Sequence, residues 1–424
     1  MGVRDATERA INAVWRIEAA KIIAAVARIV RDVGVAEELA QDALVSALEH
    51  WPAEGVPRNP AAWLTAAAKH RALDHLRHQQ MAAGKHEQIA QELQALQADV
   101  VPDFVDALDA KRADEIGDDL LRLIFTACHP VLNTDARVAL TLKLLGGLST
   151  AEIARAFLVP EPTIAQRIVR AKRALAQAQV PFELPRGDTL GPRLASVLEV
   201  VYLVFNEGYT ATTGEDWLRP ALMDEALRLG RVLAGLAPGE AEVHGLVALM
   251  ELQASRTAAR VDAEGRPVLL ADQDRGRWDR LLIRRGLAAL DQAQALGPRG
   301  PYTLQAAIAA CHARAPTVAD TDWQAIVGCY DELLAQHPSP VVALNRAVAL
   351  GMAAGPAAAL PVVEQLAADG QLARYPWLHS VHGDLLARLG RHDEARQQFE
   401  HAAALTSNSR DRALLIARAH ALRR

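Results

Sequence analysis

The chain has 424 residues, too many for one ordinary hydrophobic core, so we expect two to four domains. Hydrophobic residues make up 51% of the chain but aromatic residues only 4%, a composition that favours close-packed helices over sheets and predicts an all-α protein. The net charge of −5 argues against a protein that coats nucleic acid unaided, because non-specific binding rests mainly on phosphate neutralisation.

The three cysteines, Cys128, Cys311 and Cys329, are scattered along the chain and suggest neither a disulfide framework nor a metal site. The N-terminal residues do not form a basic segment that leads into an apolar run, and no stretch approaches about 18 uncharged apolar residues. We therefore expect a cytoplasmic protein without a metal, a cofactor or a membrane contact.

The first helical block runs from about residue 7 to residue 77, and residues 51–60, with three prolines and one glycine, predict a loop that interrupts it. Before that loop, acidic and amide groups lie on adjacent turns of one helix, a surface that suits a basic helical partner. These residues are Glu37, Glu38, Gln41 and Asp42. The alternative is a solvated acidic face without a partner.

Residues 81–117 are rich in glutamine, alanine and aspartate and have weak periodicity, so we interpret them as a linker. From residue 87 to residue 119, ten acidic residues stand against only two basic ones, Lys111 and Arg112. The linker is therefore strongly acidic, and disorder without a function is one interpretation of it.

A second helical block contains a helix-turn-helix pattern between residues 148 and 173. Ser149 and Glu152 have the spacing of a capping box, in which each side chain accepts a hydrogen bond from the other residue's backbone amide, so a helix should begin there. Residues 159–161 predict the turn, and Pro162 suits the first turn of the next helix because its missing N–H is no loss. The buried side of the first helix should be Ile153, Ala154 and Phe157.

The second helix of this motif carries the groups that could read DNA. Ile164, Ile168 and Ala171 are spaced to pack inward, which turns polar and basic side chains outward, where a recognition helix meets base edges and phosphates. The outward residues are Thr163, Gln166, Arg167 and Arg170, with Lys172 and Arg173 placed for further phosphate contacts. The alternative is a basic surface on an ordinary helical hairpin.

Residues 186–424 are again helical, beyond a boundary marked by Pro181 and Pro185. Small and large residues recur there 36 residues apart at the spacing of a tetratricopeptide helix pair, which predicts a short helical repeat domain at about residues 320–405. The two copies are Ala347, Leu350, Ala354, Ala359, Val363 and Leu366, and then Gly383, Leu386, Gly390, Ala395, Phe399 and Ala402.

Two polar clusters accompany the apolar helices of this C-terminal part and are candidate regulatory residues. Each cluster could form a ligand or metal pocket, or hydrogen-bonded turns that lock helix pairs together. The second interpretation is favoured, because no histidine or cysteine accompanies the clusters at metal-ligand spacing. The clusters are Asn206, Glu207, Gly208 and Tyr209, and Asp272, Gln273, Asp274 and Arg275.

Three segments of the N-terminal block, residues 36–42, 59–64 and 71–77, occur in the order found in sigma-70-type factors, and the linker and helix-turn-helix follow in place. Over about the first 180 residues the chain therefore resembles extracytoplasmic-function (ECF) sigma factors. It also resembles the subgroup with a long tetratricopeptide-like C-terminal extension, at residues 118–130, 204–209 and 270–275.

The resemblance implies that residues 1–80 are sigma region 2, residues 81–117 an acidic linker, residues 118–180 sigma region 4 and residues 186–424 the extension. It also implies that core RNA polymerase, through its clamp helices and flap, and promoter DNA are the partners. Region 2 would bind the clamp through the acidic surface and open the −10 element, with an unstacked base held at the proline loop. The helix-turn-helix would hold the −35 element, and the linker would thread the basic active-site cleft of the polymerase.

By analogy, the contacts to the −10 element are Asn59, Trp63, Lys69, His70, Arg71 and Arg77. A tryptophan in such a position is more often part of the core than a stacking platform. The sequence departs from the usual family pattern at Lys69-His70 and Arg77-His78, where Arg-Asn and Arg-Arg are common.

Three functions fit these patterns: a sigma factor, a free-standing helix-turn-helix regulator with a protein-binding repeat domain, and an enzyme on a helical scaffold. No phosphate loop, zinc-protease motif or serine-hydrolase motif supports an enzyme. A free-standing regulator would dimerise on half-sites and would not need the N-terminal block. We expect a sigma factor whose extension, packed on the sigma domains or on a regulatory protein, regulates it in place of a membrane-bound anti-sigma partner.

Overall fold

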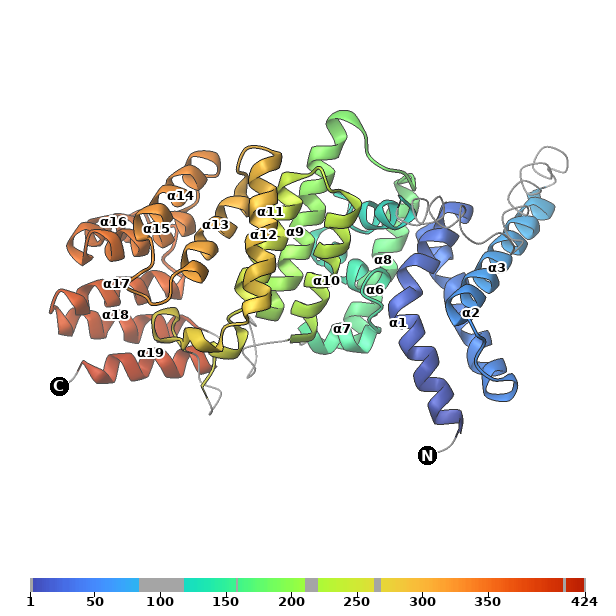
Figure 1. Ribbon diagram of the computed structural model, residues 1–424, viewed down its shortest axis with the longest axis horizontal. Coiled ribbons are helices and arrows are strands. Elements are labelled where there is room, and N and C mark those ends of the chain that lie inside the picture. Colours follow the sequence, from blue (N-terminus) through green and yellow to red (C-terminus); the bar gives the residue numbers. More distant parts are fainter. Residues whose placement is uncertain are drawn as a thin grey trace. The chain divides into compact units, whose positions relative to one another are not determined.

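The computed structural model describes residues 3–83, 118–157, 159–209, 220–262, 268–406 and 409–422. Within these ranges the regular elements are α-helices and short 3-10 helices, without a β-strand, so the predicted all-α class is confirmed (Figure 1). The chain divides into two compact units, Met1–Leu203 and Val204–Arg424, and the division falls inside helix α9 (Leu190–Tyr209). The predicted acidic linker falls almost entirely outside the described residues.

The first unit opens with three long helices, α1 (Val3–Val30), α2 (Val33–Glu54) and α3 (Pro60–Ala83). Each of the three packs against the other two. The turn between α1 and α2 is stabilised by Asp32, whose Oδ1 accepts hydrogen bonds from the amides of Gly34 (2.7 Å) and Val35 (3.0 Å). An aspartate in this position satisfies amides that the first turn of a helix leaves without partners.

The loop is shorter than the predicted range of residues 51–60, and the prediction is wrong for residues 51–54. Residues 51–54 are the last turn of α2, with Pro52 inside the helix. Trp51 is 1% exposed and meets the half-buried ring of Trp63 edge-to-face, with ring centroids 5.3 Å apart, so burial of the Trp51 ring offsets the hydrogen bond that proline cannot donate. The loop begins at Gly55, whose φ of 89° favours glycine and whose N–H donates to the Trp51 carbonyl (2.9 Å).

The remainder of the first unit consists of a helix over residues 118–127, followed by α6 (Thr134–Leu144), α7 (Thr150–Phe157), α8 (Glu161–Gln177) and the first part of α9. Helices α6, α7 and α8 pack against one another. The 3-10 turn η1 (Gly187–Thr189) precedes α9. The proline-containing segment predicted as a boundary therefore lies within this compact unit.

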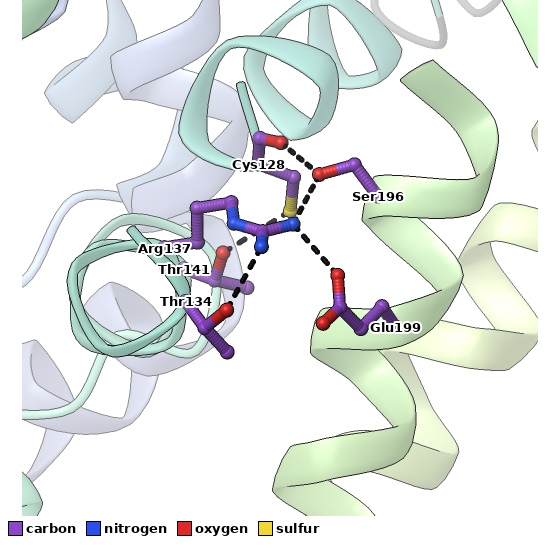
Figure 2. Close-up of polar contacts among 6 residues, drawn as sticks. All are labelled: Cys128, Thr134, Arg137, Thr141, Ser196 and Glu199. Atoms are coloured by element: carbon purple, nitrogen blue, oxygen red, sulfur yellow. Dashed lines mark hydrogen bonds and ion pairs between the residues drawn. The ribbon is translucent and has the colours of Figure 1, made fainter. Parts of the chain in front are cut away.

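Arg137 of α6 joins α9 to the rest of the first unit (Figure 2). Its guanidinium donates to Ser196 Oγ (2.5 Å), Glu199 Oε2 (2.9 Å) and Thr134 Oγ1 (2.9 Å). Ser196 Oγ in turn donates to the carbonyl of Cys128 (2.6 Å). The first part of α9 is thus held to α6 and to the end of the 118–127 helix by a connected polar network.

The same network surrounds a buried thiol. Cys128 is 1% exposed, and its Sγ lies 3.3 Å from the hydroxyl of Thr141 (Figure 2). Burial raises the pKa of the Cys128 thiol to about 11, so the group stays neutral near pH 7. The interpretation of Cys128 as a core residue is consistent with this burial.

The second unit is organised around α11 (Ala241–Ala254), which is buried on every side. Helices α10 (Pro220–Leu236), α12 (Arg280–Leu296) and α13 (Pro301–Arg314) all pack against it. The short turns η2 (Thr257–Ala259), η3 (Leu270–Asp272) and η4 (Arg275–Arg277) lie between α11 and α12 in the chain. An apolar sequence without a polar face is what such a central position requires.

In the described part of the second unit six further helices follow, and each contacts the next one along the chain (Figure 1). They are α14 (Trp323–Gln336), α15 (Pro340–Ala353), α16 (Pro356–Ala368), α17 (Pro376–Arg388), α18 (His392–Leu405) and α19 (Ser409–Ala421). The predicted small positions lie where helices approach closely: a Cβ on Gly383 would lie 3.0 Å from the Phe399 ring and 3.1 Å from the Ala395 carbonyl. Ala347, Ala359 and Val363 belong to the same buried cluster.

The stability of the second unit should depend on pH through His312 of α13. His312 is 8% exposed, and burial, with the nearby charges of Arg256 and Arg275, lowers its pKa to about 4. In the unfolded chain a histidine titrates near about 6.5, so only the unfolded chain gains a proton between these values. We therefore expect the urea midpoint to fall from pH 7 to pH 4.5, and to fall less in His312→Phe. His337→Phe, which alters an exposed histidine, should keep the wild-type dependence.

Candidate nucleic-acid interface

The helix-turn-helix predicted between residues 148 and 173 forms in the described part of that range, except that Phe157, which was expected to be buried, is half-buried. Ser149 donates its amide to Glu152 Oε2 (2.8 Å), and Glu152 donates its amide to Ser149 Oγ (3.2 Å), which confirms the capping box. Helix α7 follows this box, and α8 begins at Glu161 with Pro162 in its first turn. The capping box therefore fixes the residue at which α7 begins.

The inward face of α8 is also confirmed: Ile164, Ile168 and Ala171 are at most 5% exposed. On the outward face, Thr163, Gln166, Arg170 and Arg173 are exposed. The other two predicted residues have acidic partners within the first unit. Arg167 pairs with Asp135 of α6 (3.1 Å), and Lys172 pairs with Glu37 of α2.

The residues predicted to meet the −10 element lie on the loop before α3 and along α3 itself. Asn59 caps α3, because its Oδ1 accepts from the Ala62 amide (3.1 Å). Arg71 donates to Ser46 Oγ of α2 (2.6 Å), and Trp63 packs on Trp51.

Other predicted residues pair within α3. His70 and Arg77 both approach the carboxylate of Asp74, at 3.1 Å and 3.0 Å. Lys69 is half-buried.

The acidic surface of α2 divides in two. Glu38, Gln41 and Asp42 are exposed, whereas Glu37 is 3% exposed and lies in the interior of the first unit. Gln41 bridges the two groups by donating to Glu37 Oε1 (2.7 Å). The carboxylate of Glu37 thus faces basic side chains of this chain and not solvent.

Two apolar side chains extend the exposed part of this surface, and the sequence reasoning missed them. Val45 is 49% exposed and Leu48 is 37% exposed, one and two turns beyond Asp42 on α2. Their helical spacing could have identified them in the sequence, since positions 38, 41, 45 and 48 fall on one face of a helix. Exposed apolar side chains rimmed by acids are typical of a protein-binding face.

The first polar cluster of the C-terminal part makes close packing contacts. Gly208 lies against α10, where an added Cβ would approach the Met223 backbone nitrogen to 2.4 Å. Tyr209 stacks on Phe205 with ring centroids 5.5 Å apart, and the Arg260 guanidinium covers its ring at 3.5 Å. Asn206 and Glu207 are half-buried on the same helix.

The second polar cluster forms a hydrogen-bonded turn. Asp274 Oδ1 accepts from the Gly276 amide (2.8 Å), and Gln273 donates to the Val268 carbonyl (3.2 Å). Arg275 donates to the carbonyls of His312 (2.5 Å) and Ala315 (2.6 Å), which fastens the turn to the end of α13. Asp272 is exposed. Among the described residues, no group of three or more acidic, histidine or cysteine side chains could hold a metal ion.

Three segments of the chain match known protein families. Residues 16–81 match sigma-70 region 2, residues 122–175 match sigma-70 region 4, and residues 193–294 match a family of unknown function. An uncharacterised protein of Rhizobium meliloti is 44% identical over 392 residues, which cover 92% of this chain and 90% of that protein.

A relative that is named as an ECF factor shows the family. The ECF RNA polymerase sigma factor SigC of Mycobacterium tuberculosis is 30% identical over 153 residues, which cover 36% of this chain and 75% of that protein. The chain belongs to the ECF sigma factors. A further ECF factor, the sigma-K factor of Mycobacterium ulcerans, is 29% identical over 159 residues, or 37% of this chain and 78% of that protein.

As an ECF sigma factor, the protein serves promoter-directed transcription initiation, and the expectation drawn from the order of motifs is confirmed. Within the described ranges, no helix combines the length and the apolar character needed to cross a bilayer. The part of the chain beyond α9 has its counterpart in the Rhizobium protein, whose match covers 92% of this chain.

Proposed function

We propose that this sigma factor holds the −35 element with the outward face of α8. The observation that carries the proposal is the exposure of Thr163, Gln166, Arg170 and Arg173 on a helix whose opposite face is buried. Amide and guanidinium groups in this arrangement can donate to base edges and to phosphates from one side. Arg167 would join them once it leaves Asp135, a pair in which Asp135 is largely exposed.

Region 2 is proposed to open the −10 element at the loop before α3. Val56, Arg58 and Asn59 are exposed there, beside the paired rings of Trp51 and Trp63. A base that leaves the duplex needs a platform with a basic rim, and Lys69, His70, Arg71 and Arg77 follow along α3 as candidate phosphate contacts. The acidic linker is proposed to occupy the basic cleft of the polymerase.

The exposed face of α2 is proposed to bind the clamp helices of core RNA polymerase, with the flap meeting region 4. This face presents Glu38, Gln41 and Asp42 around Val45 and Leu48. A basic helix with apolar side chains would bury the two apolar groups and pair with the acids, so it supplies both affinity and orientation.

Run-off transcription with core polymerase tests this assignment. The full chain should start RNA at one defined position, and substitution of either promoter element should abolish that start. A free-standing regulator binds DNA but starts no RNA. Combined −10 and −35 substitutions with no effect on the start would remove the promoter-recognition proposal.

The C-terminal extension is proposed to regulate the sigma domains directly. Support comes from α9, whose first part is fastened to α6 by Arg137 and whose last part belongs to the second compact unit. A truncation after Pro185 would also remove Ser196 and Glu199, so a chain ending at residue 209 is the better test. Equal promoter-dependent transcription by residues 1–209 and by the full chain would contradict a regulatory role.

Loss of the Arg137 network should weaken the first unit. Arg137→Ala removes three hydrogen bonds, those to Ser196, Glu199 and Thr134. Because Glu199 is half-exposed, we expect a loss of about 1–3 kcal/mol in unfolding free energy. Arg155→Ala, at an exposed position on α7, should change stability by less than about 0.5 kcal/mol. Chemical denaturation of both full-length variants provides the comparison. Equal stabilities would show that the network does not hold α9 in place.

A further inference from the structure

The two polar clusters of the C-terminal part meet in a row of alternating arginine and aromatic side chains, here called the arginine–aromatic row. The Cζ atom of Arg260 lies 3.5 Å from the centre of the Tyr209 ring, and that of Arg256 lies 6.0 Å from the same ring. Arg256 is also 5.9 Å from the centre of the Trp278 ring, over which Arg275 lies at 4.9 Å. Three cations and two rings, brought together from three segments of the second unit, therefore form one array.

The outer arginines of this row have backbone acceptors. Arg260 donates to the Tyr209 carbonyl, and Arg275 donates to two carbonyls at the end of α13. The central one differs: among the described residues, the half-buried guanidinium of Arg256 makes no hydrogen bond and no ion pair. A charged group that is partly removed from water ordinarily has a hydrogen-bonding or acidic partner. Arg256 therefore lacks the acceptor that its surroundings call for.

The groups around Arg256 add positive charge. Burial, together with the charge of Arg256, lowers the pKa of Arg260 to about 10. Burial and the same charge also lower the pKa of Arg275. The carboxylates that oppose these shifts, Asp411 and Asp320, act on the two outer arginines. The charge at the centre of the row is therefore the least compensated.

The hydrogen-bonding groups that stay unsatisfied in the row are donors. Trp278 is 3% exposed, and within the described ranges neither its Nε1–H nor the buried Nε–H of Arg275 has an acceptor. A buried donor without an acceptor costs about 1–3 kcal/mol. The row therefore suits a negatively charged acceptor and repels cations.

We propose that the arginine–aromatic row is a binding site for a small oxyanion, a carboxylate or phosphate group, that pairs with Arg256. A planar guanidinium can donate two parallel hydrogen bonds to either group, and the flanking rings of Tyr209 and Trp278 hold it in place. The negative charge would also stabilise the buried N–H groups beside it. The site goes beyond the proposed function, because its occupation requires neither polymerase nor promoter.

Equilibrium dialysis of the full-length protein against labelled inorganic phosphate, at constant ionic strength, tests the site. We expect a single phosphate site that Arg256→Met weakens at least about tenfold, because methionine keeps an unbranched stem between the rings but removes the charge and the donors. Arg284→Met, at an exposed position of α12, should bind phosphate as the wild type does. Citrate should displace the phosphate, and retention of phosphate would overturn the carboxylate half of the proposal.

Thermal unfolding separates an anion site from a purely structural row. If Arg256 only holds the two rings, Arg256→Met destabilises the second unit equally in chloride and in phosphate. If it pairs with an anion, the variant should match or exceed wild-type stability in chloride. Phosphate at about ten times its dissociation constant should then raise the unfolding temperature of the wild type alone, by roughly 3–6 °C. Absence of phosphate binding to the wild type, or equal binding by Arg256→Met, would overturn the proposal.

Discussion

Gly208→Ala is expected to destabilise the second unit by about 2–3 kcal/mol, because the new methyl group would meet backbone and not a movable side chain. Its ideal Cβ position lies 2.4 Å from the nitrogen and 2.9 Å from the Cα of Met223. Helix α9 and α10 would have to separate to admit it. For a unit of this size the loss corresponds to a fall of roughly 4–12 °C in the unfolding temperature.

Gly235→Ala on α10 is the matched control, since nothing lies within 4 Å of the methyl group that it would add. Alanine is the better helix former by about 1 kcal/mol, so this variant should be as stable as the wild type or more stable. Calorimetry of the two variants separates a packing requirement from a change in helix propensity. If Gly208→Ala kept wild-type stability, the close approach would not explain why glycine stands in the Asn206–Tyr209 cluster.

Features that depend on neighbours in the chain were predictable from the sequence. The capping box of Ser149 and Glu152 spans four residues, and both hydrogen bonds form as expected. The same holds for the inward face of α8, because helical periodicity alone places Ile164, Ile168 and Ala171 on one side. Local geometry therefore determined most of the helix-turn-helix.

Features that depend on distant segments were not predictable in this way. Glu37 is next to Glu38 on the same helix, and the side chains that pair with its buried carboxylate include Lys143 and Lys172, more than 100 residues later. Likewise, Pro52 suggested a loop, but contact with Trp63 keeps Trp51 in the last turn of α2. In both cases tertiary packing overrides the local preference.

The partition of the C-terminal part shows the same limit. Pro181 and Pro185 indicate a break in helical structure, and α9 does begin after them. Nothing local reveals that Ser196 and Glu199 lie against Arg137, about sixty residues earlier. Prolines in the sequence therefore show where one helix ends and the next begins. They do not show where a compact unit ends, because that depends on the segments against which the next helix packs.

Among single substitutions, those on the exposed face of α8 are expected to lower promoter binding most. Arg170→Ala should lower promoter affinity by about 1–3 kcal/mol, or roughly 5- to 150-fold, if its guanidinium meets a base edge. A contact to phosphate instead weakens binding equally on all sequences and reduces the salt dependence of log K by about one. Arg170 is exposed, so its loss should leave the fold intact.

Gln166→Ala distinguishes base reading from general DNA affinity. An amide can pair with adenine through two hydrogen bonds, so its loss should relax selectivity at one base pair of the −35 element while the salt dependence stays unchanged. Arg284→Ala on α12 removes an equal charge from an exposed site in the second unit and should leave promoter binding unaltered. Binding titrations of the polymerase holoenzyme at several salt concentrations provide both readouts. An equal effect of Arg284→Ala and Arg170→Ala would show that net charge, and not the face of α8, determines recognition.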